Sequence, residues 1–369
     1  MKFIYSKWNE SSLTDEQRLE KLFNLFSYIL LQTNGDVNEA LDWMSQLDEK
    51  YNFFDENLSY SDFIDQLKEK GLIDETDGMF SLTMKGEMKV RQDSFKEIFG
   101  NMKKSPEGFH ESPLSGKGIE RNNTTKKYQF GDQPQNIDTT QTLSNAFRRE
   151  GIDIDNFNLN EDDIEIYETE MQTSAATVLL VDISHSMILY GEDRITPAKQ
   201  VALGLSELIL SKYRKDSLNI VLFGDEAREV SVSELPFVSV GPYHTNTKAG
   251  LELARSILRR KKNANKQIIM ITDGKPSAIY EPGTNSRRIY KNSFGLDPKI
   301  INKTLDEAVA CRREKIKITT FMIAQDEYLI RFIQEFTAAN GGKAYYSSLN
   351  ELGEQVFVDY LRNKKRFED

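Results

Sequence analysis

The chain of 369 residues is long enough for two domains, because a single domain commonly takes about 100 to 200 residues. Its formal net charge of −10 and isoelectric point near 5.2 argue against general nucleic-acid binding, which normally requires a basic surface. No apolar run approaches the ~18 residues of a membrane span, and the apolar stretch at the start is too short for a secretory signal. We therefore expect a cytoplasmic protein that binds neither nucleic acid nor membrane.

Residues 1–103 predict a small helical domain with a hairpin. Apolar residues at helical spacing predict a helix over 16–32, a second helix capped by Asp36, and a third over 61–70. An Asp77-Gly78 turn then separates two short strands. Three helices followed by a hairpin is the order of a winged-helix domain.

The third helix of this domain would be the element that reads DNA. It carries Asp62, Asp65 and Glu69 against Lys68 and Lys70. An acidic face repels phosphate, whose neutralisation supplies much of the affinity for DNA. We therefore expect a protein-docking or spacer role for this domain.

Residues 104–161 are predicted to be a polar linker with a short helix over 140–149. The stretch is rich in Pro, Gly, Ser and Asn and shows little apolar periodicity. Within it, residues 126–132 are either ordered against a flanking domain or part of a flexible connection.

From residue 162 to residue 369, strands alternate with helices. The strands are expected at 164–167, 176–181, 218–223, 268–272, 318–323 and 343–346. The helices are expected at 197–212, 248–260, 299–313 and 328–339, and a closing helix follows the last strand and ends at about residue 361. Continuous apolar runs between polar turns are typical of strands that are buried on both faces of a parallel sheet. The alternation predicts an α/β fold, a doubly wound and mostly parallel sheet with helices on both faces.

Five oxygen-bearing side chains are expected to meet at one rim of this sheet. Asp182, Ser184 and Ser186 follow one buried strand, Asp273 follows another, and Thr245 precedes a helix. Ligands of open parallel sheets bind at the carboxyl ends of the strands. Hard oxygen donors suit Mg²⁺ or Mn²⁺. Each piece alone could be a cap or a turn, but the combination in this order indicates a metal site.

Zinc chemistry and cysteine chemistry are both disfavoured. Zinc would need three or four nitrogen or sulfur ligands, and the chain has three histidines, of which His185 and His244 adjoin the site. We expect these two to pack or to support the ligands. The one cysteine, Cys311, lies in a helical pattern and is expected to be a buried, reduced thiol.

These motifs resemble a known family. The runs Asp182-Ile-Ser-His-Ser186, Thr245-Asn-Thr247 and Ile271-Thr-Asp-Gly-Lys-Pro-Ser277 resemble the metal-ion-dependent adhesion site (MIDAS) of von Willebrand factor type A (vWA) domains, in a bacterial intracellular subgroup. The resemblance covers about residues 128–361 and implies a Rossmann-like vWA fold. It also implies that Ser184, Ser186 and Thr245 coordinate the ion directly, while Asp182 and Asp273 act largely through bound water.

The resemblance further implies partners, namely an AAA+ ATPase of the MoxR or magnesium-chelatase type and an unidentified protein client. The leading hypothesis is a non-enzymatic adaptor, whose ion accepts an acidic side chain of a partner at an open coordination position. The rival is a Mg²⁺-dependent phosphoester hydrolase. It is disfavoured because the sequence offers no Gly-x-x-x-x-Gly-Lys-Ser/Thr cradle, second metal cluster or evident general base. An extracellular adhesin is disfavoured by the missing signal and disulfides.

The connection over residues 275–298 is the candidate for a second contact with the partner. It leaves the strand that ends beside Asp273, and it is longer than the ~2 to 6 residues of a bare connection. It carries Arg287, Arg288, Tyr290 and Lys291, and arginine and tyrosine are favoured interface anchors. The alternative is a solvated surface loop.

Overall fold

The computed structural model describes residues 14–55, 57–102, 120–129, 132, 134–151, 158–170, 174–241, 243–281, 288–292, 297–323, 327–349 and 351–366. The chain divides into two compact units. One comprises Met1–Pro106 and Ala175–Leu361, and the other comprises Glu107–Ser174 and Arg362–Asp369. Among the described residues, no helix is both long enough and apolar enough to cross a membrane.

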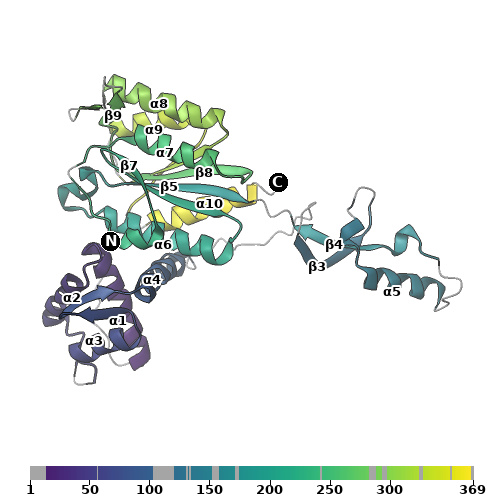
Figure 1. The fold of residues 1–369 in the computed structure, drawn as a ribbon, viewed down its shortest axis with the longest axis horizontal. Helices are drawn as coiled ribbons and strands as arrows, with labels where there is room; N and C mark the ends of the chain where they lie inside the picture. Colours follow the sequence, from purple (N-terminus) through teal and green to yellow (C-terminus); the bar gives the residue numbers. More distant parts are fainter. Residues whose placement is uncertain are drawn as a thin grey trace. The chain divides into compact units, whose positions relative to one another are not determined.

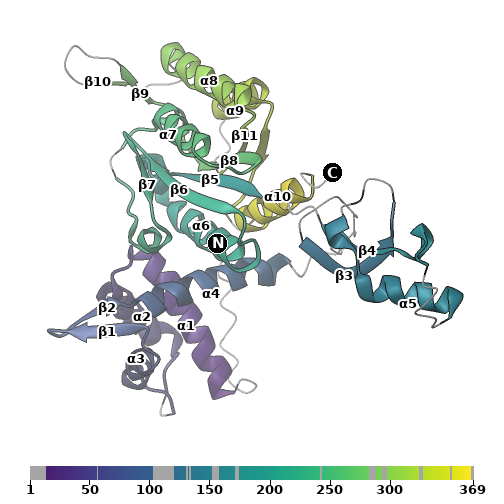
Figure 2. The ribbon, with the colours of Figure 1, turned by 45° about the vertical axis from the view of Figure 1, so that its right-hand side comes forward.

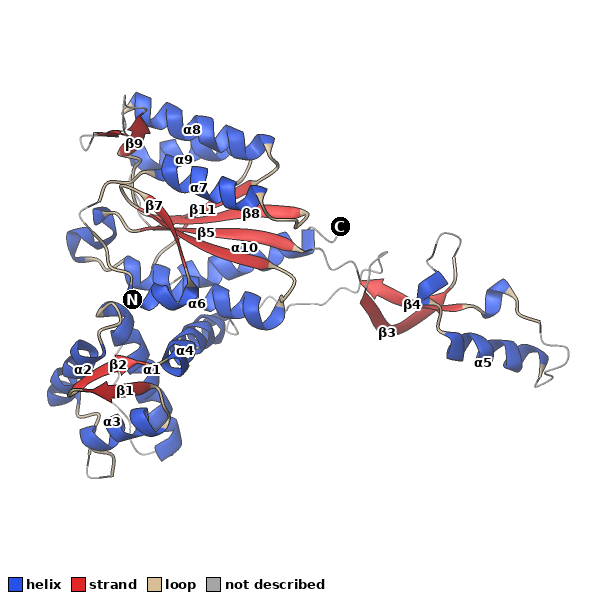
Figure 3. Cartoon of the chain, in the orientation of Figure 1, coloured by secondary structure: helices blue, strands red, loops and turns tan. Residues whose placement is uncertain are grey.

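A large sheet forms the centre of the first unit (Figures 1 and 3). It has six strands in the order β12-β11-β8-β5-β6-β7. The strands are β5 (Ala175–Asp182), β6 (Ser217–Phe223), β7 (Ala227–Val230), β8 (Asn265–Thr272), β11 (Lys317–Met322) and β12 (Lys343–Tyr346). All neighbours are parallel except β6 and β7. The mostly parallel sheet is confirmed, while the edge strand β7 was not predicted.

Helices cover both faces of this sheet (Figure 2). They are α6 (Ile195–Lys212), α7 (Thr247–Arg259), α8 (Pro298–Arg313), α9 (Glu327–Asn340) and α10 (Leu352–Arg366). Val178 and Leu180 belong to one apolar cluster with residues of α7, α8 and α9, whereas Leu179 and Val181 belong to another with residues of α6 and α10. Successive side chains of a strand point to opposite faces, so β5 is buried on both faces, as its continuous apolar run predicts. The doubly wound α/β fold is therefore confirmed.

The cluster around α7, α8 and α9 also contains the cysteine. Cys311 lies on α8, is fully buried, and forms no disulfide. Burial raises the pKa of its thiol to about 12. A thiol in this state is a poor nucleophile, because the thiolate is the reactive form.

The N-terminal elements of the first unit follow the predicted order. They are α1 (Asp15–Gln32), α2 (Val37–Tyr51), α3 (Tyr60–Glu69), β1 (Ile73–Thr76), β2 (Met79–Leu82) and α4 (Met84–Met102). Asp36 caps α2 by accepting hydrogen bonds from the backbone N–H groups of Asn38 and Glu39. Asp77 and Gly78 have φ values of 52° and 76°, as a two-residue hairpin turn requires. The long helix α4 was not predicted.

Helix α6 lies between the sheet and these N-terminal helices, so it is buried on nearly all sides. Gly204 permits the close approach of α4, because a Cβ atom there would lie 3.0 Å from Ile98 Cδ1. The contact also contains polar pairs. Arg91 Nε of α4 donates to Glu207 Oε2 at 2.6 Å, and Lys199 Nζ of α6 donates to the Leu31 carbonyl at 2.8 Å.

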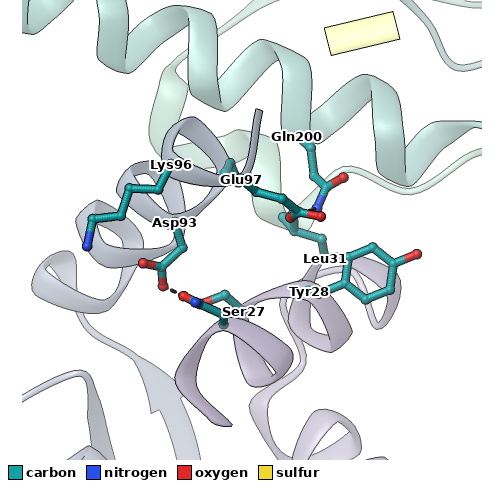
Figure 4. Close-up of a pocket in the computed structure, with 9 residues that line it drawn as sticks. Ser27, Tyr28, Leu31, Asp93, Lys96, Glu97 and Gln200 are labelled. Atoms are coloured by element: carbon teal, nitrogen blue, oxygen red, sulfur yellow. Dashed lines mark hydrogen bonds between the residues drawn. The ribbon is translucent and has the colours of Figure 1, made fainter. Parts of the chain in front are cut away.

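A polar cavity of about 210 Å³ lies between α1, α4 and α6 (Figure 4). Ser27 Oγ donates to Asp93 Oδ2 at 3.0 Å, and Gln200 Nε2 donates to Glu97 Oε2 at 3.1 Å. Burial raises the pKa of Glu97. Asp93 also accepts a hydrogen bond from Lys89, so its charge is compensated.

The second unit contains β3 (Glu120–Lys127), β4 (Glu165–Glu170) and α5 (Thr139–Glu150), with short 3-10 helices at Pro134–Asn136 and Glu161–Asp163. Strands β3 and β4 pair antiparallel. The predicted short helix is confirmed as α5. Arg149 Nη2 and Asp163 Oδ2 form an ion pair at 2.8 Å, and this hydrogen-bonded guanidinium lowers the pKa of Asp163.

The predicted boundaries after residues 103 and 161 stay predictions. They grouped the strand at 164–167 with the alternating α/β segment, whereas the structure pairs β4 with β3 and not with the large sheet. The reason is physical: β3 is polar throughout (Glu-Arg-Asn-Asn-Thr-Thr-Lys-Lys), so hydrophobic periodicity gives no sign of it.

Candidate metal centre

Two acidic residues follow neighbouring central strands at the same edge of the large sheet. Asp182 ends β5, and Asp273 comes directly after β8. The two strands are parallel, with Val181 opposite Ile271. The strand after β5 in the chain, β6, lies on the other side of β5 from β8. The edge between β5 and β8 is therefore a topological switch point, where open α/β sheets bind their ligands.

Asp182 is fully buried and fully hydrogen-bonded. Its Oδ2 accepts a hydrogen bond from Thr272 Oγ1 at 2.5 Å, and its Oδ1 accepts one from the Ser184 backbone N–H at 2.9 Å. Burial and the nearby carboxylate of Asp273 raise the pKa of Asp182 to about 7. A nearby cation would offset both causes, because it favours the ionised form.

The two serines bring Asp273 into the same cluster. Ser184 Oγ and Ser186 Oγ lie 3.1 Å apart, and Ser186 Oγ donates to Asp273 Oδ1 at 2.7 Å. Ser186 lies in the short 3-10 helix His185–Gly191. The two hydroxyls thus lie next to each other and to Asp273.

Thr245 reaches the cluster from the loop before α7. Its backbone N–H donates to Ser277 Oγ at 3.0 Å, and its carbonyl accepts the Ser277 N–H at 2.9 Å. The next residue, Asn246, caps α7 by accepting a hydrogen bond from the Ala249 N–H. The loop is therefore fixed on both sides of Thr245.

Gly274 shows that the oxygen atoms converge. A Cβ atom placed on Gly274 would lie 2.8 Å from Thr245 Oγ1, 3.0 Å from Ser186 Oγ and 3.4 Å from Asp182 Oδ2. Three side chains from two segments thus lie within 3.4 Å of one point that the glycine leaves free. Together with Ser184 and Asp273 they form a set of hydroxyl and carboxylate donors, which fits Mg²⁺ or Mn²⁺ and not a nitrogen- or sulfur-seeking ion.

Arg194 was not singled out from the sequence, yet it contacts the site. Its Nη1 donates to Asp273 Oδ2 at 2.5 Å, so both carboxylate oxygens of Asp273 are engaged. The arginine and the aspartate are 79 residues apart in the chain. Only its place in the run after Ser186, at the start of the next helix, could have suggested it.

Three of the four predicted partner-binding residues lie on a hairpin beside the site. β9 (Ala278–Glu281) pairs antiparallel with β10 (Arg288–Lys291), and Arg287 lies outside the described residues. Arg288 is exposed. Tyr290 OH donates to Asp297 Oδ2 at 2.9 Å, and Lys291 Nζ donates to Asp225 Oδ2 at 2.7 Å.

Asp225 connects this hairpin to the threonine loop. Its Oδ1 accepts the backbone N–H of His244 at 2.8 Å and lies 3.2 Å from His244 Nδ1. These contacts fit the predicted supporting role of His244. Among the described residues, no group of three or more His, Cys, Asp or Glu side chains is placed to hold a metal, so the candidate site depends on its hydroxyls.

The fold and the arrangement of these residues define a vWA-domain protein. The chain belongs to the family of Rv0959-like proteins: the model of their vWA domain matches residues 175–361, and the model of their third domain matches residues 120–169.

The curated relatives are uncharacterized. Protein Rv0959 of Mycobacterium tuberculosis and protein Mb0984 of Mycobacterium bovis are both 31% identical to this chain over 305 residues, which is 81% of this chain and 44% of each relative. The chain thus spans less than half the length of the curated relatives it matches.

Solved vWA-type structures are more distant. The vWF domain of the type V pili tip protein Mfa5 from Porphyromonas gingivalis is 13% identical with a TM-score of 0.44, and covers 54% of this chain and 98% of its own. The SpRpn10 VWA domain is 16% identical with a TM-score of 0.36, and covers 49% of this chain and 94% of its own. Similarity at this level says nothing about what this chain binds.

Proposed function

We propose that this chain is a non-enzymatic adaptor that binds an acidic side chain of a partner protein through a Mg²⁺ or Mn²⁺ ion. The observation that carries the proposal is the convergence of Thr245, Ser186 and Asp182 oxygens around the free space at Gly274. The hydroxyls of Ser184, Ser186 and Thr245 would hold the ion, with Asp182 and Asp273 supporting it through water. The bound ion would supply a positive centre with room for one more oxygen ligand.

The surface near these residues fits a protein partner. Ile188 is 45% exposed and follows Ser186 by two positions, and Tyr243 is 41% exposed and precedes Thr245 by two positions. The Tyr243 ring packs on Gly224 and Gly241, so its position is fixed although the ring is exposed. Preorganised aromatic and aliphatic side chains around a charged centre are typical of interaction hot spots.

The partner in this proposal is an AAA+ ATPase of the MoxR or magnesium-chelatase type, acting in the cytoplasm with an unidentified client. This part rests on the family resemblance of the motifs around Asp182, Thr245 and Asp273. Phosphoester hydrolysis is the competing outcome. No feature of the described residues favours it, since both carboxylates of the site are hydrogen-bonded and neither stands free as a general base.

Metal binding is tested by titrating the full chain with Mg²⁺ in a calorimeter. Asp182→Ala should abolish the binding heat because it removes a buried charge that faces the ion, while the circular dichroism spectrum stays unchanged. Asp306→Ala is the matched control, because Asp306 is an exposed carboxylate on α8. Equal Mg²⁺ affinity in wild type and Asp182→Ala would show that these residues do not form a metal site.

Partner binding is tested with a purified MoxR-type ATPase from the same organism. The complex should form with Mg²⁺, dissociate in EDTA and re-form when Mg²⁺ is restored, because a partner carboxylate is attracted only when the ion is present. The chain alone should not hydrolyse ATP or a phosphoester in single-turnover assays. Turnover that disappears in Asp273→Ala would instead establish the hydrolase.

The hairpin is tested in the same binding assay. Arg287→Ala/Arg288→Ala should weaken ATPase binding without changing the affinity for Mg²⁺, because Arg288 is exposed on β10 and contacts none of the five oxygen-bearing side chains in the described structure. Arg228→Ala, on the exposed edge strand β7, is the control. Unchanged ATPase binding would mean that the hairpin supports the loop that carries Thr245 and does not contact the partner.

A further inference from the structure

Arg194 is the cation nearest to the carboxylates of the candidate site among the contacts of the described residues. Its guanidinium contacts Asp273 through Nη1, while Nε and Nη2 donate to Glu192 Oε2 at 3.1 and 2.9 Å. The Asp273 side chain is fully buried, the Arg194 side chain is 13% exposed, and the Glu192 side chain is 57% exposed. The guanidinium thus stands between the buried site and solvent.

The backbone fixes Arg194 in this place. Its N–H donates to the carbonyl of Met187, the residue after Ser186, at 3.0 Å, and Arg194 is the N-cap residue of α6. The Met187 side chain is fully buried, so this anchor is part of the core. The backbone of Arg194 is therefore fixed beside the site, and its guanidinium is held in place by Asp273 and Glu192.

We infer that Arg194 is a positioning residue that keeps Asp273 out of direct contact with the metal ion and so leaves a ligand position for a carboxylate of the partner. This inference rests on the proposed function. Asp273 Oδ2 is held by the guanidinium and Oδ1 by Ser186, so neither oxygen is free to move onto the ion. A water molecule then takes the place that Asp273 would otherwise fill.

Charge supports the same assignment. The ion brings two positive charges, Asp182 and Asp273 bring two negative charges, and Arg194 adds one positive charge. The buried site is then net positive, although the exposed Glu192, which pairs with Arg194, opposes it. A site with this balance attracts an external carboxylate, whereas the same site without Arg194 is neutral.

A purely structural role for Arg194 is the alternative, since the ion pair also ties the start of α6 to β8. The two roles differ in what the loss of the guanidinium does to metal binding. A structural tie that is lost loosens the site and weakens metal binding. If Arg194 is a positioning residue, its loss lets Asp273 bind the ion directly. Metal binding then becomes stronger, and the ion loses one bound water.

The experiment uses Mn²⁺ as the probe on the full chain, with wild type, R194Q, R194K and the control R228Q, whose arginine is 60% exposed on β7. Calorimetry gives the affinity, and water-proton relaxation gives the number of exchangeable waters on the ion. R194Q should bind Mn²⁺ about tenfold more tightly, because the positive charge beside Asp273 is removed and Asp273 is released to bind the ion. The Mn²⁺ affinities of R194K and R228Q should stay within about threefold of that of wild type, because both variants keep a positive charge at position 194.

The water count makes the test independent of affinity. With three hydroxyl ligands, octahedral Mn²⁺ in wild type should carry about three exchangeable waters, and in R194Q about two. Acetate, as a minimal carboxylate, should displace a water from the wild-type complex and bind at least about tenfold more weakly to R194Q.

Each outcome decides. Weaker or unchanged Mn²⁺ binding in R194Q would overturn the inference and leave the metal site intact. Two or fewer waters on wild-type Mn²⁺ would also overturn it, and that measurement needs no variant. Absence of Mn²⁺ binding by wild type would overturn the proposed function and the inference together.

Discussion

Gly274 is the residue at which a single methyl group tests the candidate site. In Gly274→Ala the new Cβ would lie 2.8 Å from Thr245 Oγ1, closer than real Cβ contacts allow, and 3.0 Å from Ser186 Oγ, closer than most of them. The two hydroxyls would have to separate, so the affinity for Mg²⁺ should fall by about tenfold or more, while overpacking lowers the free energy of unfolding by about 1–3 kcal/mol.

Gly78→Ala is the control for this change. A Cβ there meets nothing within 4 Å, but its φ of 76° costs about 1–3 kcal/mol for any other residue. Calorimetric titration with Mg²⁺ and thermal unfolding should therefore separate the two variants: both lose stability, and only Gly274→Ala loses metal. Equal loss of affinity in both would mean that the effect at Gly274 comes from general destabilisation.

The sequence contained enough information to bring five oxygen-bearing residues together and too little to predict Arg194. Asp182 and Asp273 each follow a buried strand, and parallel strands end at the same edge, so their proximity follows from the fold class. Arg194 begins a helix, and its direction depends on how the 3-10 helix after Ser186 turns. No periodicity in the sequence encodes that turn.

Helix α6 is the element where the expected burial differs most from the structure. Apolar spacing assigns one face to the sheet, with Val201 and Leu205 among its members. The opposite face carries Lys199, Gln200 and Glu207, which pattern reasoning gives to solvent. In the structure these three residues form hydrogen bonds with α1 and α4. The polar face of α6 therefore contacts the N-terminal helices and not solvent.

Lys199 is the most deeply buried of these residues, with 1% of its surface exposed. Its Nζ donates to the Leu31 carbonyl and to Asn34 Oδ1 at 2.8 and 2.9 Å. Burial lowers its pKa to about 8, although Asp193 opposes the shift. The folded state therefore releases the proton more easily than the unfolded chain does.

Stability should consequently rise with pH above pH 8. Between the folded pKa of about 8 and the ordinary lysine value of 10.5, the unfolded chain binds more protons, so the free energy of unfolding increases by up to about 1.4 kcal/mol per pH unit. Below pH 8 both states are protonated and the cost of the buried charge is fully present. The measurement is urea unfolding from pH 7 to 9.5, before tyrosines titrate.

Lys199→Met should abolish this rise, because methionine carries no proton. Lys262→Met is the matched control, because Lys262 is exposed in the loop after α7. The wild-type and Lys262→Met profiles should rise together, while that of Lys199→Met stays flat between pH 8 and 9.5. Parallel profiles for all three proteins would show that Lys199 keeps an ordinary pKa in the fold.

At the scale of the molecule, the N-terminal helices and the large sheet share one apolar core. A single cluster contains Leu30 of α1, Val90 of α4, Leu203 of α6 and Phe357 of α10, and reaches Leu179 in the sheet. The sequence predicted the N-terminal elements and the sheet separately, because hydrophobic periodicity is local. Their joining depends on the close approach of Ile98 to Gly204 and Gly353, which no local pattern contains.

A chain that begins at residue 107 should therefore keep the sheet but lose stability. Removing the N-terminal helices uncovers Leu203 and Phe357, and each such side chain loses about 1.5–3 kcal/mol when it returns to water. Lys199 would lose its partners at Leu31 and Asn34 and regain solvent, so the rise of stability above pH 8 should disappear as well.

Urea unfolding of the shortened chain, with binding of an apolar dye as a second measurement, tests this expectation. The full chain should unfold in one transition of this core, since an uninterrupted cluster has no boundary at which one part can unfold first. The shortened chain should show a lower midpoint and bind the dye. The expectation fails if the shortened chain has the same urea midpoint as the full chain and the free energy of unfolding of the full chain does not rise above pH 8. The N-terminal helices would then be a separate domain that does not stabilise the vWA fold.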